Sequence, residues 1–331
     1  MDFASVLWLR PELDVRHSDG SGLIVRIGDD ARRCVVFFGK ADPMSGEIVY
    51  GGTGFLVGYD ADGARLPYLV TCRHVAKHLK SDFVIRINTT SVNLTHDRSH
   101  VLKVTAAQWE FPEDETVDLA ATTLNLNNAA YDVVYMVLNE LRAKHEVQCG
   151  DPISIVGLFR LHAGSKRNMP IVHTGNVALL PDPREKIPLK DRATGKTIEV
   201  EGYLVEAQTL EGLSGSPVFV RNFIRLSFGE LPDGSRPLVF AEVSLLGIYS
   251  GAWDGEPGEI LAADRSSRGN FRVPVGVGVV VPVEKLEHLL RDNPALKKQR
   301  ETFAAEMRAK RAAIQDDAFP VASPDSTGQR D

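Results

Sequence analysis

The feature that most constrains the fold of this chain is a succession of short apolar segments separated by turn residues. Segments such as 34–38 (CVVFF) and 83–87 (FVIRI) are rich in Val, Ile and Phe. Gly, Pro, Asp and Asn interrupt this pattern about every 8–12 positions, which is typical of a β-barrel or β-sandwich. Further strands are expected at 55–57, 68–71, 102–105, 119–123, 153–156, 171–180, 203–207, 218–220, 238–243, 245–249 and 275–281.

A few segments depart from this rhythm. Residues 129–144 have partly helical spacing and are predicted to connect two strand-rich halves, whereas 181–196 is polar and predicts an exposed loop. Residues 283–291 carry apolar side chains at i, i+3, i+6 and i+7, which predicts a short amphipathic helix. A charged helix is expected at 294–313, followed by a disordered tail of about 17 residues.

Composition excludes several classes of protein. The 331 residues are 43% apolar and 25% charged, with a net charge of −6, so the chain lacks the basic field of a dedicated nucleic-acid binder. The N-terminus does not resemble a secretory signal, and the longest apolar run is far shorter than the roughly 20 residues of a membrane-spanning helix. The cysteines Cys34, Cys72 and Cys149 are widely spaced in apolar segments and are expected to be buried thiols. We therefore expect a cytoplasmic protein that binds neither nucleic acid nor membrane.

The segment 211–220 (EGLSGSPVFV) carries the strongest chemical pattern. It places Ser214 between Gly212 and Gly215 in a turn just before an apolar strand. Glycines allow a tight turn to point two backbone N–H groups into one concavity, which is how a developing oxyanion is bound. An ordinary Gly-Ser turn is the alternative interpretation.

Two further segments carry a histidine and an aspartate. His74 follows the apolar strand at 68–71 and opens a short helical turn, and Asp118 lies inside an apolar stretch after a run of acidic residues. Taken alone, each has a structural interpretation, a buried histidine and a strand-edge aspartate. A buried carboxylate must be paired or hydrogen-bonded, so the two side chains are candidates for one site.

Taken together, the three segments resemble the chymotrypsin/trypsin-like serine peptidases, in which the order is His, Asp, Ser. The likeness is to the bacterial branch, akin to the high-temperature-requirement peptidases, and spans about residues 31–290. Other segments agree with that family: 52–57 looks like the strand before the catalytic histidine, 247–251 like the strand beside bound substrate, and 276–283 like the closing strand before a C-terminal helix.

The resemblance implies an all-β fold of two six-stranded antiparallel β-barrels packed together, with a C-terminal helix. It predicts His74 and Asp118 on the first barrel and Ser214 on the second. The expected organisation is an N-terminal arm at 1–30, a peptidase domain at 31–292 and a charged helical extension with a tail at 293–331. Within the domain the barrels are expected at about 31–142 and 143–285.

The same resemblance implies a serine endopeptidase that acts through an acyl-enzyme. Ser214 would be the nucleophile, His74 the general base and Asp118 the acid that orients the imidazole. The N–H groups of Gly212 and Ser214 would form the oxyanion hole. No cofactor or metal is expected, and the partner is a protein or peptide substrate. Substrate-binding residues are expected at Gln208, Thr209, Ser250, Gly251 and Ala252, with Ser250 also supporting the aspartate.

Some residues depart from the family pattern. Leu213 stands where zymogen-activated members carry an aspartate, so no activation by N-terminal cleavage is expected. Gln208 is a neutral amide where trypsin-type enzymes carry an acid, which disfavours Arg or Lys at P1 and favours a small or medium apolar residue. Cys72 has no evident disulfide partner beside the histidine loop, and the residues after 283 are too few for a PDZ module.

Several alternatives stay open. Ser216 is a rival nucleophile and Asp114 a rival acid. The pairs His74/His78 and His96/His100 have spacing that suits zinc on a helix, but no further ligands complete a site. A further alternative is a trypsin-like fold that has lost catalysis and acts as a binding or regulatory module. The helix at 294–313 has a basic excess with which it could dock a partner protein or an anionic surface, or it is simply a solvated terminal helix.

Overall fold

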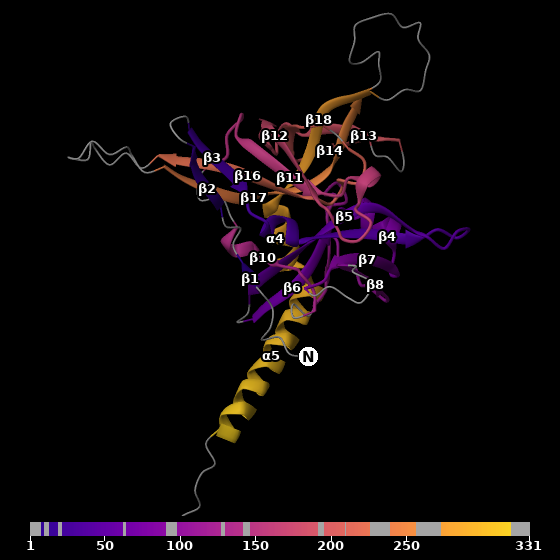
Figure 1. Ribbon diagram of the computed structural model, residues 1–331, viewed down its shortest axis with the longest axis vertical. Coiled ribbons are helices and arrows are strands. Elements are labelled where there is room, and N and C mark those ends of the chain that lie inside the picture. The colour runs from indigo at the N-terminus through magenta and orange to yellow at the C-terminus, as the bar shows by residue number, and fades with distance from the viewer. Residues whose placement is uncertain are drawn as a thin grey trace, which may run out of the picture.

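Two β-sheet units and a C-terminal pair of helices make up the described part of the molecule (Figure 1). The structure is a computed structural model. It describes residues 8–9, 13–18, 22–61, 64–90, 98–126, 130–141, 146–190, 195–208, 210–225, 239–255 and 273–318.

The first unit is an eight-stranded sheet. Its main path runs β1-β10-β5-β4-β7-β8, and β6 pairs with both β5 and β9. The pairs β1–β10 and β10–β5 are parallel, and the other pairs are antiparallel. The strands are β1 (Trp8–Leu9), β4 (Val35–Ala41), β5 (Ile48–Ala61), β6 (Ala64–Thr71), β7 (Phe83–Asn88), β8 (Ser99–Val104), β9 (Ala120–Thr123) and β10 (Tyr135–Val137).

The second unit is a closed six-stranded barrel in which every neighbouring pair is antiparallel. In barrel order its strands are β11 (Pro152–Gly157), β12 (Ile171–Leu179), β15 (Tyr203–Glu206), β18 (Val273–Pro282), β17 (Val239–Gly255) and β16 (Pro217–Arg225). Closure leaves no unpaired sheet edge along most of these strands. Two separate hairpins accompany the sheets: β2 (Leu13–Ser18) with β3 (Gly22–Ile27), and β13 (Ile187–Lys190) with β14 (Thr197–Val200).

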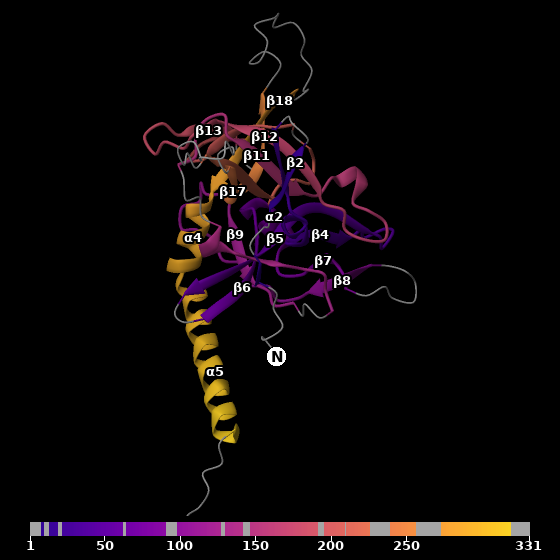
Figure 2. The same ribbon diagram turned by 60° about the vertical axis from the view of Figure 1, so that its left-hand side comes forward.

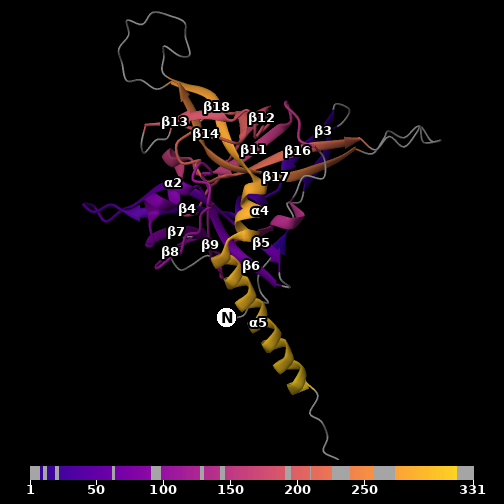
Figure 3. The same cartoon turned by 180° about the vertical axis from the view of Figure 1, so that it is seen from behind.

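Helices are few and short apart from the C-terminal pair. The α-helices are α1 (Asp30–Arg33), α2 (Arg73–Leu79), α4 (Val283–Asp292) and α5 (Pro294–Ala318), and the 3-10 helices are η2 (Leu138–Glu140) and η3 (Arg160–His162). Helix α4 buries its apolar stripe, and α5 continues along the first sheet and projects beyond the body (Figures 2 and 3). Within the described residues, no helix combines the length and apolar character that a membrane crossing requires.

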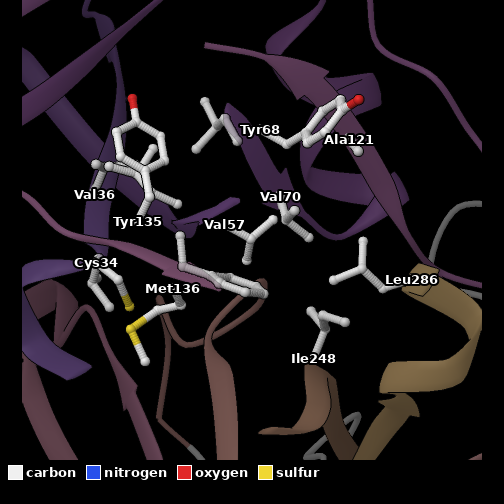
Figure 4. Close-up of a cluster of buried hydrophobic side chains, with 14 of the residues drawn as sticks. Cys34, Val36, Val57, Tyr68, Val70, Ala121, Tyr135, Met136, Ile248 and Leu286 are labelled. Carbon is white, nitrogen blue, oxygen red and sulfur yellow. The ribbon is translucent and has the colours of Figure 1, made fainter. Parts of the chain in front are cut away.

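One hydrophobic cluster spans both units, and the barrel has a further cluster of its own. Ile248 of β17 and Leu286 of α4 lie beside Val57 and Val70 of the first sheet (Figure 4), and all four side chains are fully buried. Burying each such side chain contributes about 1.5–3 kcal/mol relative to leaving it exposed. This packing holds the two sheets in a fixed relation and brings their loops together.

The predictions for the fold are confirmed in part. The chain is mostly β, the second unit is a closed six-stranded barrel and a helix follows its last strand, as expected. A pair of six-stranded antiparallel barrels is not confirmed, because the first sheet has eight strands with two parallel pairs and its described pairing path does not close. The helical prediction for 129–144 is wrong, since its described residues contain β10 and η2, and the predicted loop at 181–196 contains β13.

Candidate functional site

His74 lies at the junction between a buried strand and a short helix. Strand β6 ends at Thr71, Cys72 is extended (φ −74°, ψ 147°), and α2 begins at Arg73. His74 therefore lies in the first turn of α2. Its side chain is 43% exposed, while its neighbours Arg73 and Val75 are buried. The imidazole is the exposed polar group of an otherwise buried helical turn.

Asp118 binds His74 at two points. Its Oδ2 lies 2.7 Å from the His74 Nδ1, and its Oδ1 accepts the backbone N–H of His74 at 3.0 Å. Ser250, in the second half of β17, donates its hydroxyl to the same Oδ2 at 2.6 Å. With Nδ1–H directed at a carboxylate, a neutral imidazole carries its lone pair on Nε2. The pair thus has the form of an oriented general base.

The carboxyl of Asp118 is set to stay ionised. Burial acts to raise its pKa, but the hydrogen bond and charge interaction with His74, together with the hydrogen bonds from Ser250 and the His74 backbone, outweigh that effect. The pKa therefore lies below the ordinary value for aspartic acid. An ionised Asp118 can stabilise a positive charge on the imidazole.

Ser214 lies in the turn before β16, between two glycines with positive φ, Gly212 (+100°) and Gly215 (+88°). The turn touches the first sheet, because Thr53 donates its N–H to the Ser214 carbonyl at 3.1 Å and its hydroxyl to the Gly212 carbonyl at 2.7 Å. A Cβ at Gly215 would lie 2.1 Å from the Thr53 carbonyl oxygen. Only glycine allows this close approach between the two units.

The backbone N–H groups of Gly212 and Ser214 are available as donors. Among the described residues, neither has a hydrogen-bond acceptor, whereas the N–H of Gly215 donates to the Tyr249 carbonyl and that of Ser216 to Leu213. Within the described part of the chain, no acceptor therefore occupies the two N–H groups that are predicted to bind the oxyanion.

The three predicted catalytic side chains meet through Ser250. The Ser214 hydroxyl donates to the Ser250 carbonyl at 3.1 Å, and the Ser250 hydroxyl donates to Asp118. Among the hydrogen bonds of the described residues, none joins Ser214 to His74. The Ser214 hydroxyl is therefore hydrogen-bonded to the backbone of β17 and not to the His74 imidazole.

The described predicted substrate-binding residues lie within β17 and just after β15. Ser250, Gly251 and Ala252 belong to β17, and Gln208 follows β15. Gln208 lines a cavity of about 470 Å³ together with residues of β11, β12, β16 and β18. Thr209 lies outside the described residues.

The alternatives raised by the sequence are placed differently. Ser216 is fully buried, with its Oγ close to Gly157, and within the described chain that hydroxyl has no hydrogen-bond partner. The Asp114 carboxylate turns back on Thr116, accepting its N–H at 2.9 Å and its hydroxyl at 2.6 Å. These positions leave neither residue in contact with His74.

The histidine pairs do not form a common cluster. His78 is exposed on α2, His100 stacks on Tyr131, and His96 lies outside the described residues. The ligand atoms of Cys72, His74 and Asp118 lie within 4.8 Å of one another, but both oxygens of the aspartate already accept hydrogen bonds.

The cysteines depart from the expectation in one case. Cys34 and Cys72 are buried, as expected, but Cys149 is exposed in the turn before β11. Two further residues shape the site without having been predicted as site residues from the sequence, Thr53 and Arg73. The signal for Arg73 was present as a charged residue inside the apolar segment that carries His74.

Comparison with known proteins gives likenesses of different strength. Solved structures similar to this chain include the protease domain of MamO from Magnetospirillum magneticum (17% identity, TM-score 0.45, covering 80% of this chain and 98% of that one). A second is the active form of the Rv3671c protease from M. tuberculosis (16% identity, TM-score 0.38, covering 78% of this chain and 80% of that one). A third is the HtrA-type protease AlgW with a decapeptide (16% identity, TM-score 0.41, covering 79% of this chain and 64% of that one).

No curated protein matches the chain. The sequence does match a family model, that of the trypsin-like peptidase domain, over residues 52–222. The matched region includes His74, Asp118 and Ser214 and covers more than half of the chain. The chain therefore belongs to the trypsin-like peptidase family.

Proposed function

We propose that this peptidase is a serine endopeptidase with Ser214 as nucleophile, His74 as general base and Asp118 as the orienting acid. The observation that carries the proposal is the double hydrogen bond of Asp118 to His74, extended through Ser250 to the Ser214 hydroxyl. A nucleophile, a base and an orienting group linked in this way are what acyl transfer requires.

The first chemical step is attack by the Ser214 Oγ on a peptide carbonyl carbon. The hydroxyl first turns from the Ser250 carbonyl toward the His74 Nε2, which then takes its proton as the carbon–oxygen bond forms. Side-chain rotation of this kind takes place in picoseconds to nanoseconds at exposed positions. The protonated imidazole then gives its proton to the leaving amine as the peptide bond breaks, leaving an ester on Ser214.

Deacylation repeats the sequence with water. His74 takes a proton from the water as its oxygen attacks the ester, and returns it to the Ser214 Oγ when that bond breaks. Asp118 remains ionised throughout and stabilises the imidazolium. The N–H groups of Gly212 and Ser214 bind the oxyanion in both steps, a contribution of roughly 3–4 kcal/mol per donor in comparable sites.

The proposed substrate is an extended peptide that lies along β17. Pairing of β16 with β17 ends at Pro217 and Ile248, so the edge of β17 that carries Ser250, Gly251 and Ala252 has no partner strand in the described residues. The other edge of β17 stays paired with β18. An extended peptide can add to such an edge through its backbone.

Specificity is proposed to follow from Gln208. A neutral amide offers no charge for Arg or Lys at P1, so we expect small or medium apolar residues there. A peptide library digested by the enzyme measures this preference, and a profile dominated by cleavage after Arg or Lys would contradict it.

A second candidate is a binding module without catalysis. The observation in its favour is that the Ser214 hydroxyl donates to the Ser250 carbonyl and not to His74. In that case the same β17 edge holds a peptide without cleaving it.

A fluorophosphonate probe separates the two candidates. We expect it to label the wild type, to fail on Ser214→Ala and to label Ser216→Ala normally. The last variant is a matched control, because it removes the neighbouring buried hydroxyl. Labelling that persists in Ser214→Ala would assign another nucleophile, and no labelling of folded wild type would favour the binding module.

Three broader assignments also stand as proposals. The domain division is an arm at 1–30, a peptidase domain at 31–292 and an extension at 293–331, with the halves of the domain at 31–142 and 143–285. We further propose action in the cytoplasm and docking of a partner protein on α5.

A further inference from the structure

A buried arginine donates hydrogen bonds to the chain segment that precedes Asp118. Arg73 is 9% exposed and directly precedes His74 on α2. Its Nε donates to the Val117 carbonyl at 3.1 Å, and its Nη2 donates to the carbonyls of Pro112 (2.6 Å) and Asp114 (3.0 Å). Three backbone acceptors of one turn therefore converge on a single guanidinium.

The surroundings of Arg73 keep its charge in place. Its Cζ lies 5.3 Å from the centre of the Phe111 ring, on which a guanidinium can stack. Burial lowers the pKa of Arg73, but the negative charges of Glu115, Asp118 and Asp114 act in the opposite direction. The residue remains a cation, and its cost of burial is offset by carbonyl oxygens and nearby carboxylates.

These contacts fix a register between two chain segments. The Arg73 side chain donates a hydrogen bond to the carbonyl of Val117. His74, which follows Arg73, donates its backbone N–H to the carboxylate of Asp118, which follows Val117. Two consecutive residues of α2, Arg73 and His74, thus bind two consecutive residues, Val117 and Asp118, of the segment 112–118, which we call the acid loop. A shift of either segment would break both contacts.

We propose that Arg73 is a positioning residue that holds Asp118 in register with His74. This inference rests on the proposed function, because it assigns a role in the same site. Arg73 acts through the backbone of residues 112–117 and touches no reacting atom. Lysine cannot replace it, since an ammonium lacks the planar fork that reaches several carbonyls in fixed directions.

Few groups lie close enough to the His74 imidazole to alter the pH dependence of the reaction. Among the described residues they are the Asp118 carboxylate and the Cys72 thiol, and the Arg73 guanidinium interacts electrostatically with that carboxylate. The Ser250 hydroxyl is bound to the same carboxylate. Removing the Arg73 charge, which interacts with Asp118, would by itself move an acid limb to higher pH, so a move to lower pH reports loss of the Asp118–His74 contact.

The test compares Arg73→Met and Arg73→Lys with a matched control, Arg86→Met. Arg86 is also buried, at 6% exposure, and also donates to backbone carbonyls, those of Ala163 and Gly164, but has no contact with the acid loop. For Arg73→Met we expect kcat to fall about 100-fold, the usual effect of a small misplacement, with KM nearly unchanged. The acid limb of the kcat/KM profile should also move to lower pH, and Arg73→Lys should restore little of the loss.

A second readout does not need activity. The Nδ1 proton of His74, hydrogen-bonded to a carboxylate, should give a strongly downfield proton NMR signal in the wild type and in Arg86→Met, and a weakened or absent signal in both Arg73 variants. Failure of the wild type to react with a fluorophosphonate would reject the proposed function but leave this measurement valid. An unchanged signal in folded Arg73→Met, or an equal loss in Arg86→Met, would overturn the positioning role.

Discussion

Gly215 shows how a single position joins the two sheets at the serine turn. Its φ is +88°, and a Cβ there would lie 2.1 Å from the Thr53 carbonyl oxygen and 2.3 Å from the Thr71 hydroxyl. Both neighbours are fully buried and hydrogen-bonded to each other. Neither can move without disturbing the strands that lead to His74.

Replacing this glycine should therefore be costly. We expect Gly215→Ala to lose at least about 3 kcal/mol of unfolding free energy, since a positive φ alone costs about 1–2 kcal/mol and the clash adds to it. Gly46→Ala is the control, because Gly46 also has a positive φ (+73°) but no atom within 4 Å of its Cβ position. Urea unfolding of both variants measures the difference, and equal losses would show that the close approach is not tight.

At the scale of elements, the junction of α4 and α5 is held by side chains that cap both helices. Asn293 accepts the N–H groups of Ala295 and Leu296 at 3.0 and 3.1 Å, which caps the start of α5. Arg300, 1% exposed, donates to the carbonyls of Leu290 and Arg291 at the end of α4. The two helices are therefore locked at a fixed angle against the first sheet.

Loss of the Arg300 side chain should loosen this junction. We expect Arg300→Met to lower the unfolding free energy by about 2–3 kcal/mol, because the buried Leu290 carbonyl is left unpaired, at a cost of about 1–3 kcal/mol, and the contacts of the guanidinium with the Tyr68 hydroxyl and the Tyr59 ring are lost. Arg308→Met, on an exposed position of the same helix, should change it by no more than about 0.5 kcal/mol. Circular dichroism during thermal unfolding compares the two, and an equal small effect would contradict the role of Arg300.

Elements also show where sequence patterns fail. Period-2 patterns and turn residues predict most strands, because strands in a half-buried sheet must alternate. The pattern at 129–144 misled because three consecutive apolar residues, Val134, Tyr135 and Met136, are all fully or nearly fully buried. Tyr135 there bonds through its hydroxyl to the Leu124 carbonyl and the Leu126 N–H. Such tertiary contacts decide between strand and helix and are not visible in spacing.

At the scale of the whole molecule, the site is built from segments far apart in the chain. The sequence could indicate the motifs around His74, Asp118 and Ser214, because each needs particular residue types in a local turn. The family resemblance also indicated that Ser250 supports Asp118, but the sequence could not indicate that the Ser214 hydroxyl would donate to the Ser250 carbonyl, nor that Arg73 would bind three carbonyls about 40 residues away. These contacts depend on how the sheets pack, and a local pattern carries no information about that.

The assembled site also couples stability to pH. The folded-state pKa of Asp118 lies below its unfolded value of about 3.9, so the contact with His74 contributes stability that is fully present above that value. That contribution is lost as pH falls from about 5 through the folded-state pKa, where the carboxyl takes up a proton. We expect the difference in unfolding free energy between wild type and Asp118→Asn to shrink steadily as pH falls through this range.

Ser250→Ala provides the matched comparison for that prediction. The variant keeps the carboxyl and its contacts with His74 but removes one hydrogen bond that lowers the pKa of Asp118. Its acid-induced loss of stability should therefore be smaller than in the wild type and should be complete at a higher pH, while its onset, which the unfolded-state pKa sets, stays near pH 5. Urea unfolding of the three proteins between about pH 3 and pH 7 follows this loss from its onset near pH 5 through the unfolded-state pKa of about 3.9. A difference between wild type and Asp118→Asn that stays constant over the whole range would mean that the carboxyl is not held by the site in its charged form, and the orienting role proposed for it would fall with that result.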